Sequence, residues 1–272
     1  MPLPEAPEAL AVESLVASEV LALALRALGR DRLAIASSFG AEDVVLIDLV
    51  ASLEPRPRVF TLDTGRLPQE TYDLMDQVRR RYAIDVEVYF PQTERVEAMV
   101  RDKGLNLFYE SIENRTSCCH VRKVEPLGRA LATVDGWVTG LRRDQIATRV
   151  ETAKIAPDPQ HGGIWKIAPL ADWSRERVWA YIREHDLPYN ALHDRGYPSI
   201  GCGPCTRAVQ PGEDERAGRW WWELPEEREC GIHFDPRSGR MVRNERVAAG
   251  VAGPFDTPGP LDAESRRGGG PA

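Results

Sequence analysis

Cysteine spacing is the clearest chemical signal in the sequence, which contains five cysteines. Cys118 and Cys119 are adjacent, whereas Cys202 and Cys205 have the C-x-x-C spacing that lets two sulfurs reach one metal ion or form a redox pair. Tetrahedral zinc usually takes ligands about two to four residues apart, whereas an iron–sulfur cluster offers a larger set of anchoring corners. The spacing therefore favours a [4Fe–4S] cluster held by all four paired cysteines. Zinc binding, or buried cysteines acting as small apolar side chains, are the alternatives.

The remaining cysteine, Cys230, has no partner nearby in the sequence. A nucleophilic thiol must be in the thiolate form, which neighbouring cations favour, and it needs access both to substrate and to a second thiol. Cys230 lies in a polar segment with several arginines before it and His233 three residues after it, although the adjacent Glu229 opposes ionisation. These neighbours are compatible with a nucleophile, but a lone exposed cysteine is by itself more often incidental.

Two polar turns follow apolar runs of the kind that form buried strands. Ser37-Ser38-Phe39-Gly40 follows residues 33–36, and Asp63-Thr64-Gly65-Arg66 follows residues 58–62. In an open parallel sheet the ligand site lies at the carboxyl ends of the strands, where loops and helix N-termini present backbone N–H groups. Hydroxyls, glycines and an arginine in such turns suit a phosphate or a nucleotide, although ordinary surface turns have similar compositions.

Several clusters of basic residues could bind an anion. Residues 140–149 contain three arginines directly after an apolar run, and Arg216 and Arg219 could close on the same ligand. Arginine forks match the oxygens of phosphate and sulfate groups, although each of these residues could instead form a surface salt bridge. Arg122 and Lys123 follow the first cysteine pair, where cations would stabilise thiolates around a cluster.

Apolar periodicity predicts an α/β fold. Short apolar runs that alternate with longer helices argue for an open, mostly parallel sheet with helices on both faces. The predicted strands are residues 33–36, 58–62, 85–89, 137–140 and 165–168, and the predicted helices are residues 12–28, 44–50, 68–82 and 174–185, the last with a serine cap.

Composition and charge describe an ordinary globular protein. The chain has 272 residues, of which 28% are charged, and its net charge of −7 argues against a protein that coats nucleic acid. The sequence has no apolar run of about 18 residues and no signal-peptide pattern, so we expect a cytoplasmic protein without membrane contact. We predict an α/β domain over residues 1–209, a mobile lid with the cysteine tail over 210–235, and a disordered tail over 236–272.

Taken together, the motifs closely resemble those of the assimilatory adenylyl-sulfate reductases. These enzymes are relatives of the phosphoadenylyl-sulfate reductases and have the adenine nucleotide alpha-hydrolase-like fold. The resemblance covers roughly residues 33–235 and rests on Ser37-Ser38-Phe39-Gly40-Ala41-Glu42-Asp43, Leu62-Asp63-Thr64-Gly65-Arg66, Cys118-Cys119-x-x-Arg122-Lys123, Gly140-Leu141-Arg142-Arg143, Cys202-x-x-Cys205 and Glu229-Cys230-Gly231-Ile232-His233.

The resemblance implies a reaction in two stages. The thiolate of Cys230 would attack the sulfur of adenosine 5'-phosphosulfate, releasing AMP and leaving an S-sulfocysteine on the enzyme. Thioredoxin would then attack the Cys230 sulfur and expel sulfite. The [4Fe–4S] cluster on the paired cysteines would have a structural and electrostatic role. Family members often form dimers or tetramers, so the resemblance allows a homo-oligomer.

The resemblance also implies roles for individual residues. It places Cys230, His233, Lys123, Arg216 and Arg219 in the catalytic machinery. Those implied to bind substrate are Ser38, Phe39, Gly40, Asp43, Leu62, Asp63, Thr64, Gly140, Arg142 and Arg149, and the metal ligands are Cys118, Cys119, Cys202 and Cys205. Two departures are Ile146, where the family commonly has serine, and the roughly forty residues that follow the Glu-Cys-Gly-x-His motif.

Three alternatives stay open. The phosphoadenylyl-sulfate reductases lack the two cysteine pairs, but some cluster-containing relatives accept both substrates. An adenylating RNA-thiolation enzyme shares the fold, yet its phosphate loop resembles Ser-Gly-Gly-x-Asp-Ser rather than the Ser-Phe-Gly-Ala-Glu-Asp found here. A non-catalytic metal-binding module would leave Cys230 and the arginines unexplained.

Overall fold

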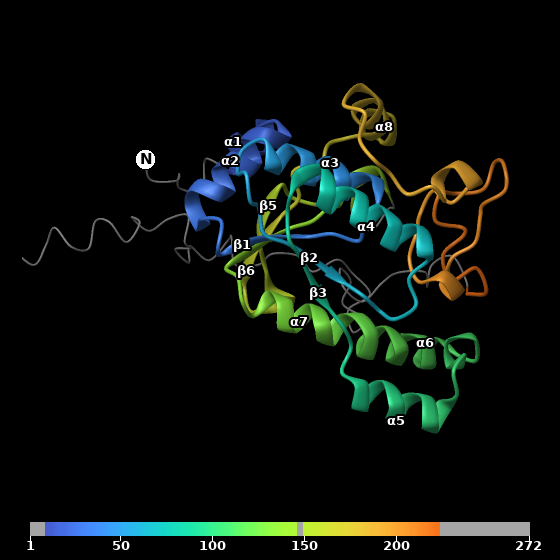
Figure 1. Cartoon of the computed structure of the whole chain (residues 1–272). Helices are drawn as coiled ribbons and strands as arrows, with labels where there is room; N and C mark the ends of the chain where they lie inside the picture. Colours follow the sequence, from blue (N-terminus) through green and yellow to red (C-terminus); the bar gives the residue numbers. More distant parts are fainter. Residues whose placement is uncertain (1–8, 146–148, 224–272) are drawn as a thin grey trace, which may run out of the picture.

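A six-stranded sheet forms the centre of the computed structural model, which describes residues 9–145 and 149–223 (Figure 1). The strand order is β3-β2-β1-β4-β6-β5. Every neighbouring pair is parallel except β5 and β6, which are antiparallel. The strands are β1 (Leu33–Ala36), β2 (Val59–Leu62), β3 (Val86–Tyr89), β4 (Gly136–Val138), β5 (Ile155–Asp158) and β6 (Ile164–Ile167).

Helices cover both faces of the sheet, as predicted (Figure 1). On one face, α2, α3, α4 and α8 pack against alternate strand residues such as Ile35, Val59 and Val138, forming the larger apolar core. On the opposite face, α7 packs on Phe60 and Trp137. The helices are α1 (Ala9–Ser14), α2 (Ala17–Leu28), α3 (Ala41–Ala51), α4 (Gln69–Tyr82), α5 (Thr93–Lys103), α6 (Ile112–Cys119), α7 (Glu125–Leu131) and α8 (Arg175–Glu184). Because α3 follows β1 and α4 follows β2, their N-termini meet at the carboxyl edge of the sheet.

The N-terminal helix differs from its prediction. We expected one helix over residues 12–28, but the chain forms α1 and α2 with a break between them. Val16 is extended, and its backbone N–H donates to the Glu19 carboxylate at 2.9 Å, which caps α2. Apolar periodicity continues across the break, so it did not reveal this local hydrogen bond.

Strand β5 was not predicted from the sequence. It forms the antiparallel edge of the sheet, where Ile155 pairs with Ile167 of β6. Pro157 interrupts the apolar pattern of the strand. Proline cannot donate to a strand ladder, so it is tolerated at an edge but argues against a strand when only the sequence is read.

A π-helical turn joins α6 to α7. The turn runs from His120 to Val124, directly after Cys118 and Cys119, and contains Arg122 and Lys123. Single π-helical turns often occur at functional sites because they redirect side chains within an otherwise regular helix. Arg122 donates from Nη1 to the carbonyl oxygen of Thr64 at 2.6 Å, so the turn faces the polar loop after β2.

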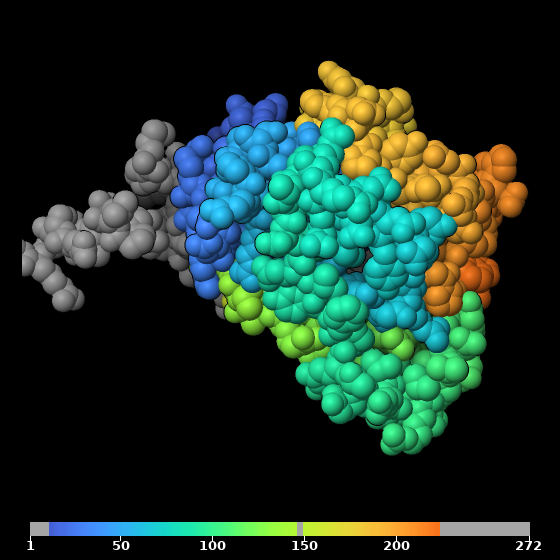
Figure 2. Space-filling model, viewed as in Figure 1, coloured from blue at the N-terminus to red at the C-terminus, as the bar shows by residue number. Residues whose placement is uncertain are grey.

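Residues 210–223, here called the arginine segment, pack against the chain around the C-x-x-C sequence. Trp220 is buried, its backbone N–H donates to the Cys205 carbonyl oxygen at 3.2 Å, and Arg219 forms a β-bridge with Thr206. In the space-filling view this orange segment meets the green residues around 105–119 without a break in the surface (Figure 2). The sequence showed little core periodicity here, yet Trp220 is a core residue. The mobility of the segment and the boundary at residue 209 stay predictions.

Within the described residues, no helix has both the length and the apolar character needed to cross a membrane.

Candidate active site

A cavity of about 270 Å³ opens at the carboxyl ends of β1, β2 and β4. Pockets for small ligands commonly occupy roughly 300–1,000 Å³, so the size suits a compact nucleotide. Eight of the predicted substrate residues line the cavity, namely Ser38, Gly40, Asp43, Leu62, Thr64, Gly140, Arg142 and Arg149. They come from separate loops, which the parallel strands bring to one edge of the sheet.

The loop after β1 is held by Asp43, near the start of α3. The Asp43 carboxylate accepts hydrogen bonds from the Ser38 backbone N–H at 2.6 Å and from the Ser38 hydroxyl at 2.8 Å. Burial raises the pKa of the Asp43 carboxyl to about 6, against the opposing effect of these hydrogen bonds. Phe39 takes a left-handed backbone conformation with φ 58° and turns its side chain into the apolar core. Phe39 therefore shapes the loop through its backbone, and its side chain does not line the cavity.

The loop after β2 connects the large cavity with the cysteines. Asp63 accepts hydrogen bonds from the Gly65 backbone N–H at 2.7 Å and from the Tyr72 hydroxyl at 2.9 Å, so its carboxylate stabilises the turn. Asp63 is not among the residues that line the cavity. Thr64 is fully buried, lines the cavity, and has its Oγ1 3.3 Å from the Sγ of Cys202. Thr64 thus lies between the predicted nucleotide site and the predicted metal site.

The four paired cysteines line a second, smaller cavity. Cys118 and Cys119 lie at the end of α6, while Cys202 and Cys205 flank the turn at Gly203. Three of the thiols are buried in an apolar cluster that includes Phe108 and Trp220, and cationic side chains complete the cavity: Arg66, Arg115, Arg122 and Lys123. Cysteines that are far apart in the sequence therefore meet in a pocket with a positive wall.

Burial and neighbouring charges shift the pKa values of these thiols in different directions. Burial acts to raise the pKa of Cys202, but the charge of Lys123 and the hydrogen bond from Thr64 outweigh it, and the pKa is lowered. Burial and the neighbouring Cys202 raise the pKa of Cys205 to about 12. Burial also raises the pKa of Cys118, against the charge of Arg122. Burial therefore disfavours the thiolate forms of Cys118 and Cys205, whereas metal binding displaces thiol protons.

The four cysteines that line one cavity are the described residues that could hold a metal centre. A single zinc needs its sulfurs within about 2.3 Å of one point, whereas a cluster binds each thiolate at a different iron. Four cysteines around one cavity are compatible with the second arrangement.

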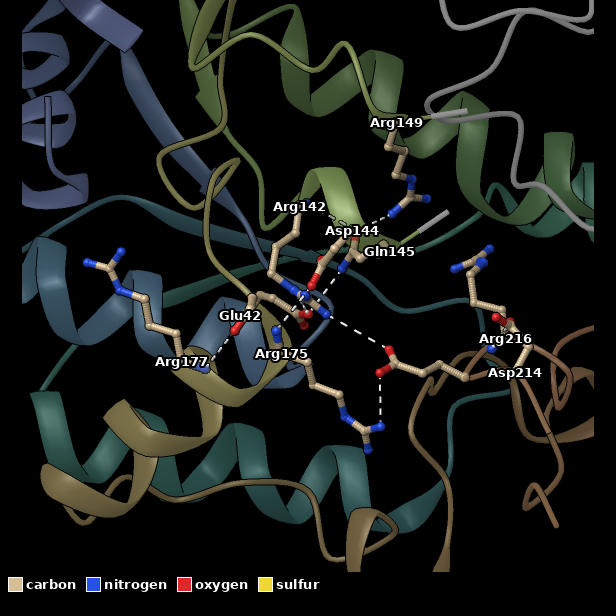
Figure 3. A network of polar contacts seen from close by, with 11 residues as sticks. Glu42, Arg142, Asp144, Gln145, Arg149, Arg175, Arg177, Asp214 and Arg216 are labelled. Atoms are coloured by element: carbon tan, nitrogen blue, oxygen red, sulfur yellow. Dashed lines mark hydrogen bonds and ion pairs between the residues drawn. The ribbon is translucent and has the colours of Figure 1, made fainter. Parts of the chain in front are cut away.

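Basic side chains form one end of the large cavity. Lys123, Arg149, Arg216 and Arg219 all line it, and Lys123 also lines the cysteine cavity. Arg149 donates from Nη1 to the Gln145 side-chain oxygen at 2.5 Å (Figure 3). Arg219 is held over the Trp220 ring, with 4.7 Å between its guanidinium carbon and the ring centroid. Four cations at one end suit an anion such as a phosphosulfate.

Arg142 lines the same cavity among acidic side chains, and Gln145 bonds both Arg149 and Glu42 there. The Arg142 guanidinium is 3% exposed and forms ion pairs with Glu42 at 2.8 Å, with Asp144, and with Glu215 at 3.9 Å (Figure 3). Its charge is therefore engaged by carboxylates, so Arg142 forms part of the cavity wall. The motif after β4 indicated an anion-binding residue, but the sequence did not show which carboxylates would surround it.

Other predicted residues fall elsewhere. Cys230 and His233 lie outside the described residues, as does Ile146. The prediction omitted Gln145, Arg175 and Glu215, which line the cavity. The mixed charges of Gly-Glu-Asp-Glu-Arg could have suggested an ion-pair network, but they did not identify its partners.

Gly140 should be intolerant of any side chain. A Cβ atom there would lie 2.7 Å from Asp43 Oδ1 and 2.8 Å from Glu42 Cβ, too close for carbon. Overpacking of this kind costs about 1–3 kcal/mol, so we expect Gly140→Ala to weaken AMP binding by about tenfold, measured by calorimetry.

Gly128→Ala is the matched control for Gly140→Ala. A Cβ at Gly128, inside α7, would meet no atom within 4 Å, so AMP affinity should be unchanged. Wild-type affinity in Gly140→Ala would contradict the packing at this edge of the cavity.

The chain is similar in sequence to proteins of known function. The model of the phosphoadenosine phosphosulfate reductase domain matches residues 32–208. A protein from Burkholderia cepacia named adenosine 5'-phosphosulfate reductase is 53% identical over 75% of this chain and 81% of that protein. One of the same name from Allochromatium vinosum is 50% identical over 80% of this chain and 88% of its own.

A solved structure also matches. The phosphoadenylyl-sulfate reductase of Candida auris, crystallised as a phosphate complex, superposes with a TM-score of 0.63 and 29% identity. The match covers 75% of this chain and 95% of that one. The shared sheet and the extent of sequence identity show that the chain belongs to the family of phosphoadenosine phosphosulfate reductase domains.

Proposed function

We propose that this protein reduces adenosine 5'-phosphosulfate to sulfite and AMP in sulfate assimilation. The observation that carries the proposal is the position of Lys123, which lines both the nucleotide-sized cavity and the cysteine cavity. The relatives named adenosine 5'-phosphosulfate reductase support the choice of substrate. A cation between the two sites can act on the phosphosulfate and on the thiolates at the same time.

The proposed chemistry uses Cys230 as the nucleophile. Its thiolate attacks the sulfur of the phosphosulfate, an S–S bond forms, and the S–O bond to AMP breaks. The leaving phosphate gains negative charge, which Lys123, Arg149, Arg216 and Arg219 stabilise from the basic end of the cavity. His233 is proposed to face the same group.

An external dithiol completes the proposed cycle. One thiolate of thioredoxin attacks the Cys230 sulfur and expels sulfite, and the second thiol then closes the thioredoxin disulfide and frees Cys230. The two electrons that reduce the sulfo group come from the dithiol. Attack on Cys230 requires that its sulfur reach the thiol of another protein.

We further propose that Cys118, Cys119, Cys202 and Cys205 hold a [4Fe–4S] cluster. Bound there, it would supply a compact centre of thiolate-bound iron that orders α6 and the turn at Gly203 and modifies the charge near Lys123. The four thiols facing one cavity and its cationic wall support this assignment. Anaerobically purified protein should be brown and contain iron and sulfide. A colourless, zinc-loaded protein that is fully active would contradict the cluster.

The substrate without a 3'-phosphate is the proposed one. The relatives that are named adenosine 5'-phosphosulfate reductase, at 53% and 50% identity, support this choice. Reduction of phosphoadenylyl sulfate, alone or in addition, is the alternative because the structural relative from Candida auris carries that name.

Two measurements test the proposed function. Mass spectrometry after mixing with adenosine 5'-phosphosulfate should show an adduct of SO₃ mass on Cys230, and turnover should be compared with and without a 3'-phosphate on the substrate. Active protein without the adduct would contradict the mechanism, and preference for the 3'-phosphate would contradict the substrate.

We propose that the enzyme is cytoplasmic. We also propose that it acts without nucleic acid, which is consistent with its net charge of −7. A homo-oligomer is possible, as in other members of the family.

A further inference from the structure

The arginine segment contacts the rest of the protein on two sides. Along one side it is held by neighbours in sequence, since the Arg207 backbone N–H donates to Gly218 at 3.0 Å and the Trp220 N–H donates to Cys205 at 3.2 Å. On the other side Glu215 reaches the far wall of the large cavity. The segment therefore spans the cavity instead of lying only beside it.

Glu215 bridges two separate elements of that wall. Its Oε1 lies 2.9 Å from Nη1 of Arg175, the first residue of α8, and its Oε2 lies 3.9 Å from Nη2 of Arg142, in the loop after β4 (Figure 3). Arg142 is in turn paired with Glu42 at the start of α3. One carboxylate thus connects the arginine segment to elements on the opposite side of the predicted nucleotide site.

Arg216 follows Glu215 directly in the sequence. Both residues line the cavity. The turn around them is short, since the Arg216 N–H donates to Asp214 Oδ1 at 2.8 Å and the Arg219 N–H donates to the Arg216 carbonyl oxygen at 2.8 Å. In such a turn a shift of the Glu215 backbone would also shift the adjacent Arg216 backbone.

Two of the described ion pairs of the arginine segment differ in their exposure to solvent. The Glu223 carboxylate and the Arg115 guanidinium are 2.8 Å apart, with side chains only 3% and 6% exposed, so opening this pair would leave a buried charge uncompensated. Glu215 and Arg175 are 35% and 43% exposed. Partly exposed pairs contribute little net energy and are screened by salt, so the Glu215 contact can open and close.

We propose that Glu215 is a positioning residue that latches the arginine segment over the bound nucleotide through Arg175 and Arg142. The latch places Arg216 at the phosphosulfate and opens to release AMP. The inference rests on the proposed function, because it takes the large cavity as the nucleotide site.

A double-mutant cycle tests the latch. Glu215→Gln, Arg175→Gln and the double variant are compared with wild type for kcat and KM toward adenosine 5'-phosphosulfate, and for Tm. We expect each single change to raise KM by about two- to fivefold, the range for partly exposed ion pairs, with kcat within about twofold of wild type. The double variant should be no worse than the worse single variant, since the shared interaction is lost only once.

Glu213→Gln is the matched control. Glu213 lies in the same segment and pairs with Arg207 at 2.8 Å, but it is not among the residues that line the cavity. Its replacement should leave KM unchanged. If the charges of the segment had only a structural role, Glu213→Gln would raise KM as much as Glu215→Gln does. At about 1 M salt, where screening acts over roughly 3 Å, the KM values of Glu215→Gln and wild type should converge.

The possible results distinguish a failure of the latch proposal from a failure of the proposed function. Additive effects in the double variant, an unchanged KM in Glu215→Gln, or an equal rise in Glu213→Gln would each contradict the latch. Wild-type protein that neither binds nor turns over adenosine 5'-phosphosulfate would instead contradict the proposed function.

Discussion

Cys230→Ser is expected to lower turnover of adenosine 5'-phosphosulfate by at least about a thousandfold while the iron content and AMP affinity stay at wild-type values. A serine hydroxyl is far less acidic than a thiol, so the nucleophile is absent near neutral pH, and neither an S-sulfo intermediate nor a substrate for thioredoxin forms. Turnover is measured as sulfite release with excess reduced thioredoxin, and the adduct is sought by mass spectrometry.

Cys119→Ser is the control for this result. Cys119 lines the cysteine cavity, so its replacement should lower the iron content, in contrast to Cys230→Ser. The two variants thus test whether the paired cysteines bind metal while the single cysteine is the nucleophile. Full turnover in Cys230→Ser, or loss of iron from it, would contradict the proposed division.

Lys123→Ala is expected to lower kcat/KM by about 10²- to 10³-fold, the usual effect of removing one preorganised charge from an active site. Lys123 lines both cavities and lowers the pKa of Cys202, although burial of that thiol acts in the opposite direction. Its loss would leave the departing phosphate with less compensating charge. Steady-state kinetics give the effect, and iron analysis shows whether the metal site survives.

Lys103→Ala provides a matched control for Lys123→Ala. Lys103, at the end of α5, donates to the Asn114 side-chain oxygen at 3.0 Å and is exposed. Neither cavity has Lys103 among its described lining residues, so kinetics should be unchanged. Equal losses in both variants would indicate a general effect of charge, and a kcat/KM near wild type in Lys123→Ala would contradict its placement between the sites.

Local patterns predicted the strands β1, β2, β3, β4 and β6 and the helices α2, α3, α4 and α8, but not α5, α6 and α7. The apolar run at residues 33–36 forms β1, and the Ser174 hydroxyl accepts a hydrogen bond from the Arg177 N–H at 3.2 Å, as a predicted helix cap should. Strand pattern and capping depend on residues within one turn or one strand. The break at Val16 and the proline-containing edge strand β5 were missed because a continuous apolar pattern and a proline each pointed the other way.

The site required contacts that no local pattern specifies. Thr64 and Cys202 are 138 positions apart, yet their side chains lie 3.3 Å from each other. Arg142 and Glu42 are separated by 100 positions and form a 2.8 Å pair. The sequence therefore indicated which residue types were present, but not that an arginine would be neutralised by carboxylates.

By itself, the sequence determined the alternation of strands and helices, the polar loops at the carboxyl edge of the sheet, and the separation of paired cysteines from a single one. Only the tertiary structure decided that Lys123 lines two cavities, that Phe39 turns into the core, and that Glu215 pairs with Arg175. The physical reason is range: hydrogen-bond periodicity and capping act between neighbours in sequence, whereas charge pairing and burial depend on which distant segments pack together.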